Sequence, residues 1–177
     1  RLVQAGSGEH FGIEEIAIHP RWQGGKGPDL ALLRIRPEAA GQLTALPLLA
    51  AERLRDLRPG VQIGTLGYPG ELASRYLTAG DGERLPGVVP TFKTGWIGRI
   101  TGADGTAAAP EQARLVQHSA SLSKGTSGSP LFDGDGNVVA VSFGGIGAKD
   151  ATDMSTGQIG FAVSADEIVA LRAEVGW

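Results

Sequence analysis

The amino-acid sequence predicts an all-β fold that ends in one amphipathic helix. Two observations lead to this prediction: short apolar or alternating runs recur along the chain, and turn sequences separate them. The 28 Gly and 10 Pro residues suit many tight turns between strands. The chain has no Cys, so its stability has to come from packing, without disulfides or thiolate metal sites.

Eight segments have the composition of strands, in the order 12–19, 30–35, 61–68, 94–100, 113–119, 129–132, 137–143 and 159–164. Between them, residues 23–29, 101–106 and 133–137 carry the glycines that turns need where φ becomes positive. Residues 69–93 are long and weakly patterned, so we expect an exposed loop that borders a functional region.

Two segments depart from the strand pattern. Residues 50–58 are mostly polar and precede Pro59-Gly60, which indicates a connector or a single helical turn. Residues 164–177 predict the terminal helix, with Ser164 or Asp166 as its cap. We expect its apolar side to pack on the β structure through Ile168, Val169, Leu171 and Val175.

Composition and charge limit the classes of function. With 41% hydrophobic and 20% charged residues, the 177-residue chain is typical of one globular unit with its own core. A net charge of −3 without a basic cluster argues against nucleic acid as a partner. No run approaches the roughly 18 apolar residues of a membrane span. No leader precedes the first strand, so we expect one to have been removed or never included.

The segment 124–130, KGTSGSP, places the hydroxyl of Ser127 among residues of very small bulk. A serine becomes a nucleophile when a base takes its proton and amide groups stabilise the oxyanion that forms on the substrate. Flanking glycines let backbone N–H groups converge beside Ser127, and those of Gly125 and Ser127 itself are the candidates. The alternative interpretation is an ordinary Gly/Ser turn between strands.

Asp29 stands directly before the apolar run 30–35, in the segment GPDLALLRI. A carboxylate at such a half-buried junction is able to orient an imidazole. The alternative role for Asp29 is that of a turn or strand-capping residue.

The two motifs DLALLRI and GTSGSP together resemble the trypsin-like serine proteases, whose aspartate and nucleophile motifs are D-[IL]-A-L-[LI] and G-x-S-G-x-P. Further segments are similar to that family in the same order, namely IHPRW, VQIGTLGYPG, VVAVSFGG and IGFAV. The lack of Cys and the GYP and IGFAV segments look closer to bacterial members, such as the HtrA-type and related trypsin-like peptidases, than to secreted animal enzymes. The resemblance implies two Greek-key β-barrels followed by the helix, and a secreted or periplasmic location more than a cytoplasmic one.

The resemblance also implies a site. Ser127 would be the nucleophile, Asp29 the orienting carboxylate, and the amides of Gly125 and Ser127 the oxyanion hole. Protein or peptide substrate would add as a short strand along Ser142 and Gly144, with Phe143 as the apolar floor of the cleft. No cofactor is implied.

The histidine of the triad has no match in the chain. His10 lies in a predicted turn, His19 occupies a position that is structural in the family, and His118 has a rim or structural role as its simpler interpretation. We therefore expect the catalytic histidine upstream of Arg1, together with the first strands of the first barrel. On this interpretation residues 1–50 are the remainder of that barrel, 51–60 the connector, and 61–177 the second barrel with the terminal helix.

The primary specificity pocket is expected to be neutral. Ser121, six residues before the nucleophile, stands where the family places the base of this pocket, and Gly144 and Gly160 look like open walls. We expect a preference for a neutral, apolar or medium-sized side chain, because an unpaired charge in a dry pocket is unfavourable. Thr126 replaces the aspartate that pairs with a newly cut N-terminus in animal members, so activation by N-terminal insertion is not expected.

The sequence allows three other interpretations. Asp133, Asp135 and Asn137 alternate as in an EF-hand loop, but Val138 and Gly144 stand where that loop needs Gly and Glu, so a hairpin turn and no metal site is predicted. An esterase of another fold would need G-x-S-x-G, which GTSGS does not match. A catalytically inactive, peptide-binding protein of the same fold is the main alternative to the serine endopeptidase.

Overall fold

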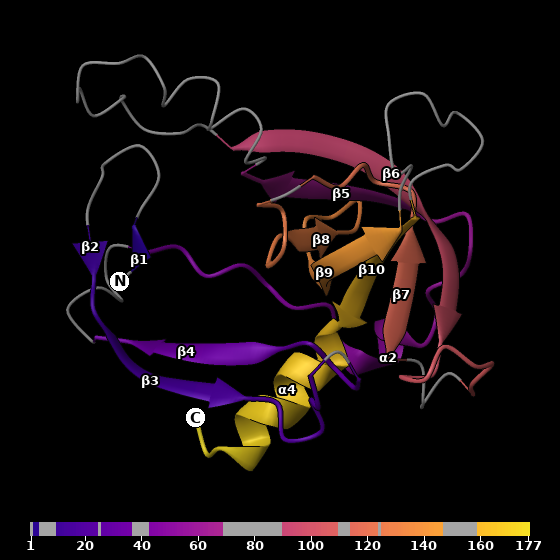
Figure 1. Ribbon diagram of the computed structural model, residues 1–177. Coiled ribbons are helices and arrows are strands. Elements are labelled where there is room, and N and C mark those ends of the chain that lie inside the picture. Colours follow the sequence, from indigo (N-terminus) through magenta and orange to yellow (C-terminus); the bar gives the residue numbers. More distant parts are fainter. Residues whose placement is uncertain are drawn as a thin grey trace.

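Strands form most of the regular structure in the computed structural model, which describes residues 2–3, 10–24, 26–36, 43–68, 90–109, 114–123, 125–146 and 159–177 (Figure 1). Two helices lie in this described part, α2 (Ala51–Leu54) and α4 (Ala165–Glu174). None of its helices is both long enough and apolar enough to cross a membrane.

Six strands close into an antiparallel barrel, and all of them come from the last two thirds of the chain (Figure 1). They are β5 (Gln62–Gly67), β6 (Thr91–Thr101), β7 (Leu115–His118), β8 (Pro130–Phe132), β9 (Val138–Ile146) and β10 (Ile159–Ser164). Around the barrel they follow the order β10-β7-β6-β5-β8-β9. The closed order leaves no strand edge of this sheet unpaired, which removes a common route to aggregation.

The core of the barrel comes from the inward-facing positions of its strands. Its buried members include Ile63, Ile97, Val116, Leu131, Val139 and Ala162. One position in the wall requires glycine: a Cβ at Gly95 would lie 2.3 Å from the backbone nitrogen of Ala120. The alternating apolar pattern of the sequence therefore closes a small, well-filled barrel.

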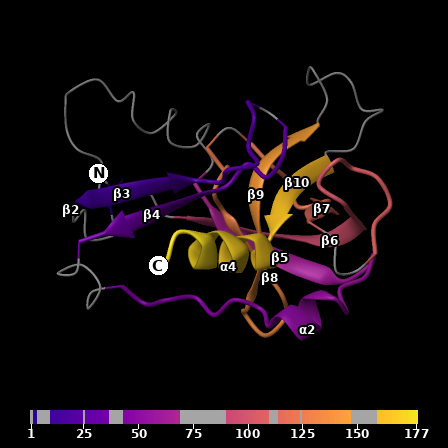
Figure 2. The same ribbon diagram turned by 90° about the horizontal axis from the view of Figure 1, so that it is seen from below.

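The N-terminal residues form two separate two-stranded sheets. The first pairs β1 (Leu2–Val3) with β2 (His10–Phe11), and the second pairs β3 (Ile13–Ile18) with β4 (Ala31–Ile35). In the β3–β4 hairpin, Leu32 faces α4 and packs with buried Leu30 against that helix and the barrel. Figure 2 shows the hairpin projecting beyond the barrel, with α4 beside it.

The opposite face of the hairpin is apolar and open in the described structure. Ile16 pairs with Leu33 across the hairpin, and their exposed fractions are 58% and 42%. Ile18 is 59% exposed on the same strand. A two-stranded hairpin with an apolar face is marginal by itself, so this sheet depends on what it packs against.

Helix α4 joins the hairpin to the barrel. Leu171 is completely buried on it, and Ile168 and Val175 pack against the same cluster. The sequence-based expectation was wrong for Val169, which is 54% exposed because it lies on the solvent side of the helix. The helix begins after Ser164 as predicted, but this side chain makes no capping hydrogen bond, and it is buried.

All eight predicted strands are present, and the helical turn predicted within 50–58 is α2. Strand β6 begins at Thr91, so the last residues of the predicted loop 69–93 belong to a strand, while 69–89 lie outside the described residues. His10 is part of strand β2 instead of a turn. The predicted hairpin turn at 133–137 is confirmed, with Gly136 at φ +84°.

Candidate active site

Ser127 lies in a tight turn that leads into β8. Gly125 and Gly128 both have positive φ, +91° and +85°, which only glycine adopts freely. Inside the turn, the amides of Thr126 and Ser129 donate to the carbonyls of Ser123 and Thr126, each at 3.1 Å. The small residues of KGTSGSP are therefore needed for a backbone that folds back on itself at this point.

Thr126 holds the turn from inside. Its hydroxyl is buried and donates to the carbonyl of Ser123 at 2.7 Å. The turn is fastened to strand β9 as well, because the amide of Gly128 donates to the carbonyl of Ser142 at 2.7 Å. These bonds use the polar groups of the turn internally and do not involve an ion pair.

The groups expected to do chemistry point outward from this turn. Ser127 is exposed, and its hydroxyl donates to the carbonyl of Phe143 at 3.1 Å. The N–H groups of Gly125 and Ser127 bind no other residue within the described ranges. An accessible hydroxyl therefore stands beside two backbone donors that have no intramolecular acceptor among these residues.

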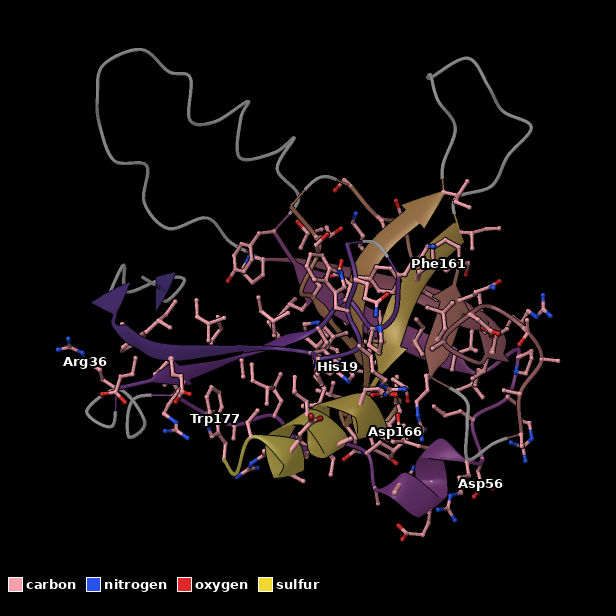
Figure 3. All side chains as sticks on the ribbon, turned by 60° about the horizontal axis from the view of Figure 1, so that its bottom comes forward. His19, Arg36, Asp56, Phe161, Asp166 and Trp177 are labelled. Atoms are coloured by element: carbon pink, nitrogen blue, oxygen red, sulfur yellow. The ribbon has the colours of Figure 1, made fainter. Side chains whose placement is uncertain are left out.

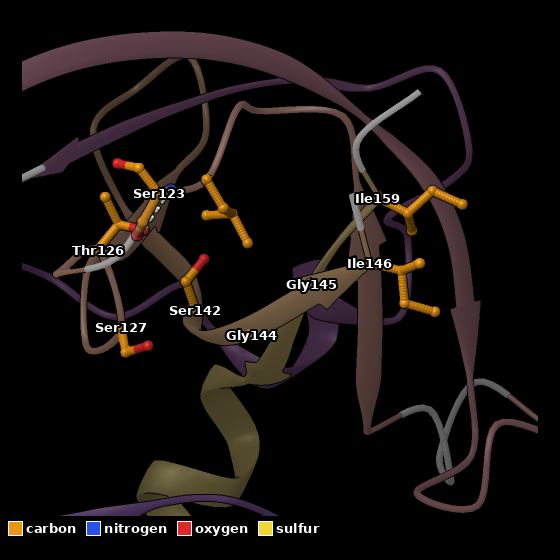
Figure 4. A pocket seen from close by; sticks show the side chains of 9 residues that line it. Ser123, Thr126, Ser127, Ser142, Gly144, Gly145, Ile146 and Ile159 are labelled. Carbon is orange, nitrogen blue, oxygen red and sulfur yellow. Dashed lines mark hydrogen bonds between the residues drawn. The ribbon is translucent and has the colours of Figure 1, made fainter. Parts of the chain in front are cut away.

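A pocket of about 210 Å³ opens next to Ser127 (Figure 4). Strands β9 and β10 and the segment before the turn line it with Leu122, Ser123, Thr126, Ser127, Ser142, Gly144, Gly145, Ile146 and Ile159. None of these nine residues has an acidic or basic side chain, and their only polar side-chain groups are hydroxyls. Gly144 faces open space, since a Cβ there would meet nothing within 4 Å.

His118 lies behind the pocket. It is buried, its Nε2 is 3.2 Å from the hydroxyl of Ser142, and Ser142 lines the pocket. Its Nδ1 lies near the backbone of Ala120 without a well-formed hydrogen bond to the described residues. Burial lowers the pKa of His118 to about 4, so the ring is neutral at neutral pH.

Two residues expected in the pocket lie elsewhere. The space beside Gly160 is filled by the ring of His118, because a Cβ there would lie 2.2 Å from Cε1, so Gly160 does not form an open wall. Ser121 is exposed, its carbonyl accepts from Nζ of Lys93 at 3.1 Å, and it is not among the lining residues. Leu122 and Ser123, the next residues along the chain, take its place.

The residue that follows Asp29 and the residue that accepts from the Ser127 hydroxyl belong to one hydrophobic cluster. Asp29 is exposed and makes no hydrogen bond or ion pair with the described residues, while the next residue, Leu30, is buried. Phe143, whose carbonyl accepts from Ser127, packs against the cluster that contains Leu30. Phe143 also stacks on Phe161, with ring centroids 6.4 Å apart.

Neither of the histidine side chains that the structure describes binds Ser127. His19 is buried and bonded to Glu167, and His118 is bonded to Ser142. His10 is placed in β2, and its side chain lies outside the described part. Within the described residues, Ser127 and Asp29 therefore have no imidazole between them.

A charge network surrounds the buried carboxylate of Glu167, and nothing in the local sequence pattern indicates it. Glu167 on α4 accepts from His19 at 3.0 Å and from Arg21 at 2.6 and 2.8 Å, and it forms an ion pair with Nε of Arg114 at 2.9 Å. Arg114 also pairs with Asp166. Figure 3 shows His19 beside the first turn of α4, where Asp166 lies. The partners are far apart in sequence, so no local pattern could have connected them.

The turn at Asp133 is organised by its own side chain. The Asp133 carboxylate accepts from the amides of Asp135 and Asn137 and from the side chain of Asn137. Burial alone would raise the pKa of Asp133, but these hydrogen bonds and nearby Arg53 lower it below its usual value. No group of three or more His, Cys, Asp or Glu residues suited to a metal ion occurs in the described residues.

A closed antiparallel barrel with an accessible serine in a glycine-rich turn is the arrangement of a serine hydrolase of the trypsin type. A profile of the trypsin-like peptidase domain matches residues 2–141, and the chain belongs to this family. This agrees with the resemblance seen in the two sequence motifs.

Individual relatives support the same assignment. The chain is 32% identical over 140 residues to "Serine protease HTRA4" of Mus musculus, which covers 79% of this chain and 23% of the mouse protein. The chain thus spans about a quarter of the length of this curated relative. Because the relative comes from a mouse, the expected bacterial origin is not shown.

Two solved structures share the fold. Rv3671c from M. tuberculosis H37Rv, in an inactive form with a Ser343Ala mutation, has a TM-score of 0.56 at 21% identity, covering 94% of this chain and 64% of the other. The HtrA-type protease AlgW, solved with a decapeptide, also has a TM-score of 0.56, at 20% identity, covering 84% and 37%. At these identities the similarity establishes the trypsin-like fold and no more.

Proposed function

We propose that this chain is the serine-bearing part of an endopeptidase that cleaves peptide bonds through an acyl-enzyme at Ser127. The observation that carries the proposal is the accessible Ser127 hydroxyl beside the amides of Gly125 and Ser127, which have no acceptor among the described residues. The Ser127 oxygen would attack the substrate carbonyl, and its proton would pass through a histidine to the leaving amine. Water then hydrolyses the ester, which returns the hydroxyl.

Asp29 is proposed as the carboxylate that orients the histidine. Its carboxylate is exposed and has no partner among the described residues, so it is available to an imidazole. We propose that this histidine comes from a part of the polypeptide outside these 177 residues. The apolar face of the hairpin formed by Ile16, Ile18 and Leu33 supports this, because further strands packed on it would complete an N-terminal barrel.

The pocket beside Ser127 is proposed to take the substrate side chain that precedes the cleaved bond. Leu122, Ile146 and Ile159 supply apolar walls, and Gly144 leaves the entrance open. Because the described lining residues include no acidic or basic side chain, a Lys, Arg, Asp or Glu side chain would find no charge partner among them. A neutral side chain of medium size fits best, and Ser142 and Gly144 on β9 would pair with the substrate backbone.

A catalytically inactive, peptide-binding protein is the second candidate function. The observation that favours it is that neither described histidine side chain reaches Ser127. The same pocket and the same strand β9 would then bind a peptide without cleaving it. A secreted or periplasmic location remains a prediction for either function.

A fluorophosphonate probe separates the two functions. The natural full-length protein and the 177-residue chain are labelled in parallel, each with a Ser127→Ala control, and the adduct is mapped by mass spectrometry. The proposal expects an adduct at Ser127 in the full-length protein that the control lacks, and little or none in the 177-residue chain. No adduct in a folded full-length protein would exclude the endopeptidase and leave the peptide-binding protein.

A further inference from the structure

Glu167 is a buried carboxylate, only 1% exposed, in the first turn of α4. Burying a carboxylate is costly unless hydrogen bonds and charges compensate it. Here the imidazole of His19 and the guanidinium group of Arg21 donate to it, and the guanidinium group of Arg114 forms an ion pair with it. These contacts bring three separate segments of the chain together, namely residues 19–21, Arg114 and helix α4.

Two of the three partners of Glu167, His19 and Arg21, lie at the beginning of the loop that connects β3 to β4. The amide of Arg21 donates to Nδ1 of His19 at 3.2 Å, so Nδ1 is the acceptor and Nε2 carries the proton that Glu167 accepts. His19 is therefore fixed on both sides of its ring. Gly27 closes the connection onto this corner, because a Cβ there would lie 2.1 Å from the carbonyl oxygen of Arg21.

The end of the same connection is Asp29. The amide of His19 donates to the carbonyl of Leu30 at 2.9 Å. The backbone next to Asp29 is therefore bonded to His19, whose side chain is in turn bonded to Glu167. The Asp29 side chain has no hydrogen bond of its own to the described residues. The place of its carboxylate is therefore set by the backbone, and the backbone is set by His19 and the burial of Leu30.

The third partner, Arg114, connects Glu167 to the barrel. Arg114 directly precedes β7, and its carbonyl accepts from the amide of Ser164 at 3.0 Å, at the end of β10. Strand β10 pairs with β9, which carries Phe143 and so the acceptor of the Ser127 hydroxyl. A continuous set of contacts thus links the Asp29 backbone to the strands around Ser127.

We infer that Glu167 is a positioning residue of the active site, which fixes Asp29 relative to Ser127 through His19 and Arg21. This inference rests on the proposed endopeptidase function. Glu167 touches neither the substrate nor the reacting atoms, so it acts on the rate of the chemical step through the geometry of Asp29.

The test compares two carboxylate-to-amide changes on the same helix of the full-length protein. Glu167→Gln removes the charge that holds the hairpin, whereas Asp166→Asn removes a charge that pairs only with Arg114 among the described residues. We expect Glu167→Gln to lower kcat and the rate of Ser127 labelling by about 10- to 100-fold, the size of effect that small misplacements produce, with KM unchanged. Asp166→Asn is expected to stay within about 2-fold of wild type.

A double-mutant cycle with Asp29→Asn distinguishes positioning from general weakening of the fold. If Glu167 acts through Asp29, adding Glu167→Gln to the Asp29→Asn variant produces no further loss of rate. Glu167→Gln should nevertheless lower the melting temperature by the same amount in the wild-type and in the Asp29→Asn background. Independent, multiplying losses of rate would overturn the inference. Arg21→Gln is the milder variant if Glu167→Gln does not fold, because Arg21 is largely exposed, and the same non-additivity with Asp29→Asn is required of it.

The two proposals fail in different ways. A folded wild-type protein without a Ser127 adduct contradicts the endopeptidase function itself. A wild-type protein that labels, together with a folded Glu167→Gln variant that labels as fast as Asp166→Asn, contradicts the role of Glu167 alone.

Discussion

The ring of His118 lies directly against Gly160, so that a Cβ at Gly160 would come within 2.2 Å of the imidazole. The two residues pair across strands β7 and β10 at the back of the pocket. The contact determines which residues fit at position 160, and the burial of the same ring makes the stability depend on pH.

The packing consequence is that Gly160 tolerates no side chain. Gly160→Ala forces the buried ring of His118 to move and is expected to lower the free energy of unfolding by about 1–3 kcal/mol. Denaturant unfolding measures this change. Gly144→Ala is the matched control, because a Cβ there meets nothing within 4 Å, and equal losses from both variants would show that the His118 contact is not responsible.

The pH consequence follows from the pKa of His118, which burial lowers to about 4 from an ordinary value of 6.5. Between these values the unfolded chain binds a proton that the folded protein excludes. The contribution of neutral His118 is therefore fully present above about pH 6.5 and is lost as pH falls toward 4, by up to about 3 kcal/mol.

Unfolding free energies at pH 7.5 and 4.5 check this prediction, in wild type and in His118→Gln. The variant has one titrating group fewer, so its stability should fall less over this interval. The NMR titration of the His118 ring gives the pKa directly, and a value near 6.5 would contradict the prediction.

The turn at Ser127 depends on the buried hydroxyl of Thr126, which donates to the carbonyl of Ser123. Thr126→Val leaves that carbonyl without this partner and should lower the free energy of unfolding by about 1–2 kcal/mol. Thr126→Ser keeps the hydroxyl and should recover most of the loss. Denaturant unfolding of the three proteins tests this, and the idea is wrong if the Val variant is as stable as the Ser variant.

The pocket predicts a change of specificity at Gly144, which lines it and faces open space. Gly144→Val would fill part of the about 210 Å³ volume. In the full-length protein, kcat/KM for a peptide with Leu or Phe before the cleaved bond should fall about 10-fold or more, and less for one with Ala. A uniform decrease for all three peptides would show that this pocket does not select the substrate side chain.

Much of the fold could be predicted because the strands alternate apolar and polar residues, and this local pattern survives in the structure. The residues whose position depends on long-range contacts could not. Gly160 looked open in the sequence, but a ring from β7 fills its space, and Val169 fits a helical stripe that the barrel does not cover. Ser121 was placed by counting from the nucleophile, whereas the bend of the chain brings Leu122 and Ser123 to the pocket instead.

The candidate site shows the same division. Ser127 and its neighbouring glycines could be identified from a short stretch of sequence, because a tight turn with positive φ needs glycine and small residues at those positions. Glu167 could not, because its partners lie at residues 19, 21 and 114, and only folding brings them together.

The docking of the β3–β4 hairpin on α4 has a further consequence for how the protein responds to stress. The hairpin is a small two-stranded unit that one hydrophobic cluster holds against α4 and the closed barrel, so it can open while the barrel stays intact. Amide protons of β3 and β4 would then exchange with solvent well before those of β9, and activity would disappear at a lower denaturant concentration than the barrel signal. If the proposed endopeptidase function holds, a local opening equilibrium of this hairpin, instead of global unfolding, would set the conditions under which the full-length protein stays active.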